Sequence, residues 1–222
     1  MTKLLHIIVL LLPAITHAQL QEEISFSFLF EGERVQLDKE YILNDADTIR
    51  FSKIRLYVSD FHFENNKVEN NAERNGPWLL DAEKENTFKI DKPNEAATFS
   101  FCVGLDSLVN TSGALGGDLD PMNGMYWTWQ SGYIHLKIEG SCSSLQTRNK
   151  AFSFHLGGYQ HPHRAFEHRT FTVSSEGEVS LQFPLDSFLE SMDLQETNSI
   201  MSPSITASEL LSVFTSQILL AE

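Results

Sequence analysis

The chain has 222 residues, of which 41% are hydrophobic, and a formal net charge of −14 at pH 7. An acidic surface of this kind repels phosphate backbones and anionic lipid headgroups, which argues against binding to nucleic acid or to a membrane surface. The apolar runs fall far short of the roughly 20 residues that a membrane-spanning helix needs, so membrane insertion is not expected.

The first 18 residues are typical of a secretory signal peptide. Lys3 gives a basic start, an apolar run follows from Ile7 to Leu12, and the small residue Ala18 precedes the expected cleavage before Gln19. Cleavage removes one lysine and no acid, which leaves 204 residues with a net charge of −15. We therefore expect an exported protein, periplasmic or extracellular, with a single domain over residues 19–222.

The mature sequence alternates apolar and polar residues with a period of two, as half-buried strands do. In the first such run Ile24, Phe26, Phe28 and Phe30 share one face. Segments rich in turn-forming residues separate the runs. The predicted strands are, in chain order, ISFSFLF (24–30), KIRLYVSDFHFEN (53–65), ATFSFCVG (97–104), YIHLKIEG (133–140), AFSFHLGG (151–158), RTFTVSS (169–175) and EVSLQFPLD (178–186).

One helix is predicted near the end of the chain, within SPSITASELLSVFTSQILL (202–220). Thr206 is the expected N-cap, with Glu209 as its capping-box partner. An apolar stripe on this helix comprises Leu210, Leu211, Phe214 and Ile218. Seven or more short strands indicate a sandwich or a barrel. The predicted fold class is therefore all-β: an antiparallel two-sheet β-sandwich with one C-terminal helix that closes one end.

The sequence contains two cysteines, Cys102 and Cys142. Export would carry them into an oxidising compartment, where a pair can form a disulfide. Two buried free thiols and copper ligation by thiolates are the alternatives. Because two cysteines alone make a poor metal site, the disulfide and the buried free thiols are the favoured interpretations.

The alternation also assigns faces to two histidines. In the fourth predicted strand the apolar residues leave His135 on the opposite face, where we expect an exposed polar side chain. In the fifth strand His155 also points away from the apolar face. Gly157 and Gly158 follow directly, and glycines allow a close approach of the backbone to another group. His155 is therefore the better candidate for a site.

His161, His163 and His168 follow in the segment QHPHRAFEH (160–168). Neutral imidazole is the commonest protein ligand of zinc and copper, so two or three of these rings could share a metal ion. The segment lacks a strict ligand spacing, and a solvent-exposed loop is the simpler interpretation.

Two tryptophans, Trp127 and Trp129, lie one residue apart in MNGMYWTWQSGYIHLKIEG (122–140). In a regular strand they share one face. They could fill the core or stack on a sugar ring, and the residues alone do not choose between these roles. Nearby, Asp118 and Asp120 are interpreted as turn residues that bond to backbone, and Glu139 as an acceptor able to orient a ligand imidazole.

Several segments in a fixed order resemble the MbnP-like copper-binding proteins, the family of the methanobactin-associated periplasmic protein and its relatives MopE and CorA. The likeness spans roughly Ile49 to Phe214. The segments are IRLYVSDFHFEN (54–65), PWLLDAEKENTFKI (77–90), FCVGLDSLVNTSGALGGDLDPMNGMYWTWQSGYIHLKIEG (101–140), FSFHLGG (152–158), IMSP (200–203) and ASELLSVF (207–214).

The resemblance implies a periplasmic or secreted β-sandwich that binds copper and is not a hydrolase. In characterised members, histidines hold the metal together with the amine of a kynurenine, which a di-haem MauG/MbnH-like peroxidase makes by oxidising a tryptophan. Trp127 and Trp129 fall in the matching aromatic run, and His155 is the histidine that carries over. Met201 could add a thioether suited to Cu(I). The implied partners are the copper ion and such a peroxidase.

This chain departs from the family pattern in two places. MopE has a histidine two residues after its modified tryptophan, where this chain has Trp129 or Ser131. Some members have a histidine just before the MSP motif, where this chain reads NSIMSP. The predicted function is copper acquisition or storage, and the alternative is a carbohydrate-binding or adhesive module on the same scaffold. An enzyme is not expected, because no nucleophile elbow, HExxH motif or phosphate loop is present.

Overall fold

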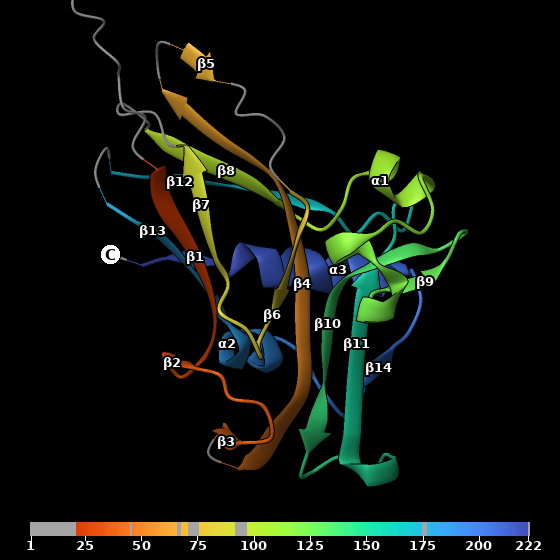
Figure 1. Cartoon of the computed structure of the whole chain (residues 1–222). Coiled ribbons are helices and arrows are strands. Elements are labelled where there is room, and N and C mark those ends of the chain that lie inside the picture. The colour runs from red at the N-terminus through yellow and green to blue at the C-terminus, as the bar shows by residue number, and fades with distance from the viewer. Residues whose placement is uncertain are drawn as a thin grey trace, which may run out of the picture.

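A computed structural model describes residues 21–44, 46–65, 68–70, 76–91, 97–174 and 177–221 (Figure 1). The predicted signal peptide, residues 1–18, lies outside these ranges, as does part of the turn-rich segment between the second predicted strand and residue 76. No helix within the described ranges is long and apolar enough to cross a membrane.

The larger of the two sheets has ten strands among the described residues. Its main path is β12-β8-β4-β10-β11-β14; β3, β5 and β6 also pair with β4, and β9 pairs with β10. The strand bounds are β3 Glu40–Leu43, β4 Asp47–Asn65, β5 Val68–Asn70, β6 Trp78–Asp81, β8 Thr98–Val103, β9 Tyr126–Thr128, β10 Gly132–Cys142, β11 Ala151–Gly157, β12 Glu167–Thr172 and β14 Ser199–Ile200.

The smaller sheet follows the order β15-β13-β1-β2, and β7 pairs with β1 as well. Its strands are β1 Gln21–Phe30, β2 Glu33–Arg34, β7 Thr87–Asp91, β13 Val179–Pro184 and β15 Leu219–Leu220. The helices are α1 Ser107–Thr111, α2 Leu185–Glu190 and α3 Ile205–Ser216, with short 3₁₀ turns η1 Gly117–Leu119, η2 Pro121–Asn123 and η3 Arg148–Lys150.

An aromatic core joins the two sheets. The four apolar residues predicted to share one face of the first strand, from Ile24 to Phe30, are all buried. The Phe26 ring lies 5.7 Å from Phe61 and 5.8 Å from Phe101 of the larger sheet, and 6.0 Å from Phe183 of its own sheet, measured between ring centroids. Such aromatic pairs add to the free energy gained by burying their apolar area. The period-two prediction is confirmed for these strands.

The predicted antiparallel arrangement is wrong in part, because both sheets are mixed. β1 runs parallel to β13, and β11 runs parallel to β14. Alternation reports which face of a strand is buried but not the direction of the neighbouring strand. Two short helices were also not predicted. Leu185 and Asp186, assigned from the sequence to a strand, begin α2, whereas α1 is a single short turn after β8.

The predicted C-terminal helix is present as α3, which runs across the strands and contacts β11 and β12 (Figure 1). Its N-cap is Ser204 rather than Thr206. The Ser204 hydroxyl accepts a hydrogen bond from the backbone N–H of Ala207 at 3.0 Å. Phe214 of α3 packs 5.7 Å from Phe183 in the smaller sheet, so the helix extends the aromatic core.

A second, smaller core lies on the outer face of the larger sheet, beneath the segment from α1 to β9. Its buried members are Tyr57, Leu105, Leu119, Met125, Tyr133 and Ile134. Two basic side chains hold the segment to the sheet: Arg55 donates to the carbonyl of Asn123 at 2.5 Å, and Lys137 donates to the carbonyl of Gly124. This segment leads into β9 and so places Tyr126 and Trp127 over the outer face of the larger sheet.

Candidate metal centre

Trp127 lies in β9, which forms a short hairpin with the start of β10. The indole packs against the smaller core and over β11. A Cβ atom built on Gly157 would lie 3.1 Å from Cζ3 of Trp127, so the ring occupies space that any other residue at 157 would fill. Its Nε1 atom is buried and has no hydrogen-bond partner among the described residues.

Trp129 has different surroundings, although only one residue separates the two tryptophans. The regular strand ends at Thr128, and Trp129 is 73% exposed. The two indoles therefore do not form one stack or one wall of a pocket.

His155 lies in β11, on the face opposite the main aromatic core, and is 6% exposed. Its Nε2 atom is 2.7 Å from Oε1 of Glu139 in the neighbouring strand β10. This hydrogen bond is the main cause that lowers the pKa of Glu139. Lys137 is aligned directly with His155 across the two strands, and burial lowers the pKa of this lysine. The contact between Glu139 and an imidazole, expected from the sequence, is present.

The register places Trp127 and His155 on one face of β11. Residues two apart in a strand share a face and lie about 6.7 Å apart along it. Gly157, which supports the Trp127 ring, is therefore the next residue after His155 on that face. Glu139 is aligned with Ser153, on the other side of His155. Along the face the order is thus Glu139, His155 and then Trp127.

The prediction that His135 is exposed is wrong: this side chain is completely buried. A β-bulge between Ile134 and Leu136 interrupts the alternation, so the face expected for a regular strand no longer applies. Nδ1 of His135 donates to the carbonyl of Ala165 at 2.5 Å, and Nε2 lies 3.3 Å from the Asn110 amide. Burial lowers the pKa of His135 to about 4, so the ring is neutral and ties β10 to neighbouring segments.

His161 and His163 lie in the turn before β12, where His161 is exposed and His163 is half-buried. His163 lines a shallow pocket. Two other loops also line it: one contributes Gln130, the residue after Trp129, and the other contributes Ser202, the residue after Met201. Met201 itself is 53% exposed. The remaining lining residues are Ser131, Gly158, Tyr159, Gln160 and Pro203.

Gly158 shows where two of these loops meet. A Cβ atom built on Gly158 would clash with the carbonyl oxygen of His163 and would lie 3.0 Å from Cβ of Pro203. The loops that carry His163 and Met201 therefore meet one residue beyond Gly157.

The structure does not bring His168 to this place. Its ring lies beside Cys102, with Nδ1 3.1 Å from Sγ. β12, which carries His168, pairs with β8 and not with β11, and His168 is aligned with Cys102. Asp60 lies near the same thiol, at 3.8 Å from Sγ. Burial and Asp60 raise the pKa of Cys102 to about 12, so the sulfur carries its proton.

Both cysteines are buried free thiols. Cys102 is aligned with Ser59 of β4, and Cys142 with Ile49 of the same strand. Ten residues of strand separate these partners by about 33 Å. A disulfide needs Cα atoms within roughly 7 Å, so this fold does not join the two cysteines.

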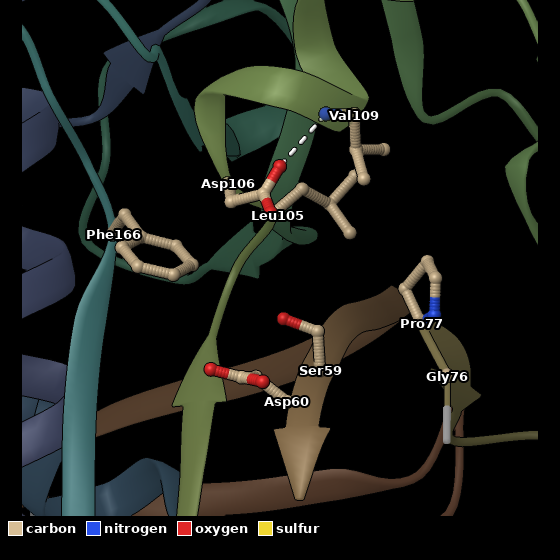
Figure 2. A pocket seen from close by; sticks show the side chains of 8 residues that line it. All are labelled: Ser59, Asp60, Gly76, Pro77, Leu105, Asp106, Val109 and Phe166. Atoms are coloured by element: carbon tan, nitrogen blue, oxygen red, sulfur yellow. Dashed lines mark hydrogen bonds between the residues drawn. The ribbon is translucent and has the colours of Figure 1, made fainter. Parts of the chain in front are cut away.

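A cavity near the Cys102 end of β8 holds none of the residues predicted for the site (Figure 2). Asp106 reaches it, but this carboxylate caps α1 by accepting a hydrogen bond from the N–H of Val109 at 2.7 Å. The lining residues are Ser59, Asp60, Gly76, Pro77, Leu105, Asp106, Val109 and Phe166.

The donors near β11 do not form a conventional metal site. Within the described ranges, no group of three or more His, Cys, Asp or Glu residues could hold a metal ion. Asp120 accepts a hydrogen bond from the nearby N–H of Met122, as expected for a turn residue. Asp118 instead accepts one from the N–H of Leu79, on the distant strand β6. The nitrogen groups present are the imidazole of His155 and the indole of Trp127, whose Nε1 atom has no hydrogen-bond partner among the described residues. This set fits copper if Trp127 is converted into a nitrogen donor.

A model of the MbnP family matches residues 19–202 of the chain. Among solved structures, MbnP from Methylosinus trichosporium is similar, with a TM-score of 0.64 and 17% sequence identity. The match covers 85% of this chain and 86% of that chain. At this level of identity the structural likeness shows a shared fold. No curated protein sequence matches the chain.

Proposed function

Because the chain belongs to the MbnP family, we propose that it binds copper outside the cytoplasm, for acquisition or storage, through His155 and a donor made from Trp127. The observation that carries this proposal is the buried, unpartnered Nε1 atom of Trp127, whose ring packs against Gly157 on the face of β11 that holds His155.

An unpartnered polar group in a protein interior needs a physical reason. Leaving a buried donor without a partner costs about 1–3 kcal/mol, and such groups are rare in folded proteins. Oxidative cleavage of the Cγ–Cδ1 bond of Trp127, with peroxide as the oxidant, followed by hydrolysis that releases Cδ1 as formate, would give kynurenine. The indole nitrogen would then be an aromatic amine. An amine and an imidazole are nitrogen donors, which copper prefers and which calcium and magnesium do not.

The surroundings favour Trp127 over Trp129 as the modified residue. Trp129 is largely in water, where its nitrogen can bond to solvent, whereas Trp127 is held against β11. His163 and Met201 are carried by loops that meet at Gly158, so either could supply a further donor. A di-haem peroxidase of the MauG/MbnH type is the proposed source of the oxidation.

Equilibrium dialysis with Cu(I) and with Cu(II) tests the proposal, on protein purified from the periplasm or medium of its native host. We expect stoichiometric binding by the natural protein and its loss in His155→Ala. His168→Ala is the matched control, because the ring of this histidine lies beside Cys102 and not beside His155 or Trp127. Copper binding that is equal in His155→Ala and the natural protein, or absent from the natural protein, would overturn the proposal.

A further inference from the structure

We propose that Glu139 is a positioning residue for this site: its carboxylate holds His155 in the Nε2–H tautomer and leaves Nδ1 as the nitrogen that binds the metal. This inference rests on the proposed copper site. The role of Glu139 in fixing the tautomer also exists without metal and can be tested separately.

The direction of the hydrogen bond follows from the chemistry of the two groups. Oε1 of Glu139 lies 2.7 Å from Nε2 of His155. An ionised carboxylate only accepts hydrogen bonds, so Nε2 must be the donor. An imidazole that binds a metal ion is neutral and has one N–H, so with that hydrogen on Nε2 the lone pair available to the metal is on Nδ1. Within the described part of the chain, Nδ1 of His155 has no hydrogen-bond partner.

The strand register places the bond on the correct side of the ring. Glu139 is aligned with Ser153, whereas Trp127 packs against Gly157, beyond His155 in the opposite direction. Glu139 therefore holds the imidazole from the side away from Trp127. It can orient the ring without occupying the space between His155 and the indole.

Two lysines lie close to this carboxylate. Lys53 of β4 is aligned with Glu139, and Lys137 lies two residues before it on the same face of β10. The Glu139 side chain is 32% exposed and that of His155 only 7%, so the hydrogen bond is partly protected from solvent. A carboxylate on the remote nitrogen of a ligand histidine fixes the ring and raises its basicity, and its loss typically lowers metal affinity about 10–100-fold.

Nitrogen-15 NMR of the histidines in the metal-free protein tests the tautomer directly. We expect His155 to be the Nε2–H tautomer in the natural protein and to lose this preference in Glu139→Ala. Glu139→Gln, which keeps the shape but removes the charge, should show a smaller change. Glu64→Gln is the control, because Glu64 is an exposed residue near the far end of β4 and makes the same change of charge.

Copper affinity is then measured on the same proteins from the native host. The proposal predicts a loss of about 10–100-fold in Glu139→Ala and none in Glu64→Gln. An Nδ1–H tautomer in the natural protein, or unchanged affinity in both Glu139 variants, would overturn it. If the natural protein binds no copper, the proposed function fails, and the tautomer measurement alone decides the role of Glu139.

Discussion

His135 and His155 lie on neighbouring strands, yet only one of them could be placed from the sequence. His155 follows the regular alternation of β11 and lies off the apolar core, as predicted. His135 stands at the bulge of β10 and is buried between Ala165 and Asn110. An inserted residue leaves no mark in the hydrophobic pattern on either side of it. The face of a residue that stands at a bulge therefore cannot be predicted from the alternation of apolar and polar residues.

The burial of His135 predicts a specific pH dependence. Its pKa falls from 6.5 to about 4 on folding, so the unfolded chain binds the proton more readily. The stability that the neutral ring provides is complete above pH 6.5 and is lost as the pH falls towards 4. We expect the natural protein to lose about 3 kcal/mol more unfolding free energy between pH 7 and pH 4 than His135→Gln, measured by urea unfolding.

Other groups titrate in both proteins, so the difference between the two pH profiles isolates His135. Parallel profiles would contradict the prediction. If His135→Gln does not fold, NMR of the natural protein gives the same answer, because the His135 ring should remain neutral at pH 5.

At the scale of elements, α3 offers a clear test because sequence and structure name different N-caps. Ser204 accepts the hydrogen bond from Ala207, whereas Thr206 lies inside the helix with an exposed side chain. Ser204→Ala should lower the unfolding free energy by about 1 kcal/mol, and Thr206→Ala should change it little. Chemical denaturation measures both. A larger effect at Thr206 would show that the helix begins later than described.

The elements also show where prediction from the sequence ends. Strand faces could be read because the core selects apolar residues with a period of two, and α3 because its apolar stripe is long. The parallel pairing of β1 with β13 joins segments more than 140 residues apart, and no local pattern encodes it. The segment from α1 to β9 is irregular, so its packing over the larger sheet, and hence the place of Trp127, could not be predicted.

For the molecule as a whole, the fold predicts that the two cysteines stay reduced. Their partners on β4 are about 33 Å apart, and Cys102 is a protonated, buried thiol. Alkylation of the exported protein after unfolding without reductant should modify both Cys102 and Cys142, and alkylation of the folded protein should modify neither. An intramolecular disulfide between the two residues would contradict the strand register.

The candidate site is assembled from parts of the chain that only the complete fold brings together. The β9–β10 hairpin supplies Trp127 and β11 supplies His155. The loops before β12 and α3 approach the end of β11 through His163 and Pro203. The resemblance to a family could identify most of these residues in advance. Their order along β11, and the position of His168 beside Cys102, depend on strand pairing that the sequence does not reveal.

Peptide mass spectrometry of the protein from its native host tests the central claim most directly. We expect the peptide that contains both tryptophans to have lost one carbon and gained one oxygen, with fragment ions that place the change on Trp127 and leave Trp129 intact. The natural protein should carry copper in the same preparation. Copper bound to a chain with an unmodified Trp127, or a modification confined to Trp129, would contradict the account.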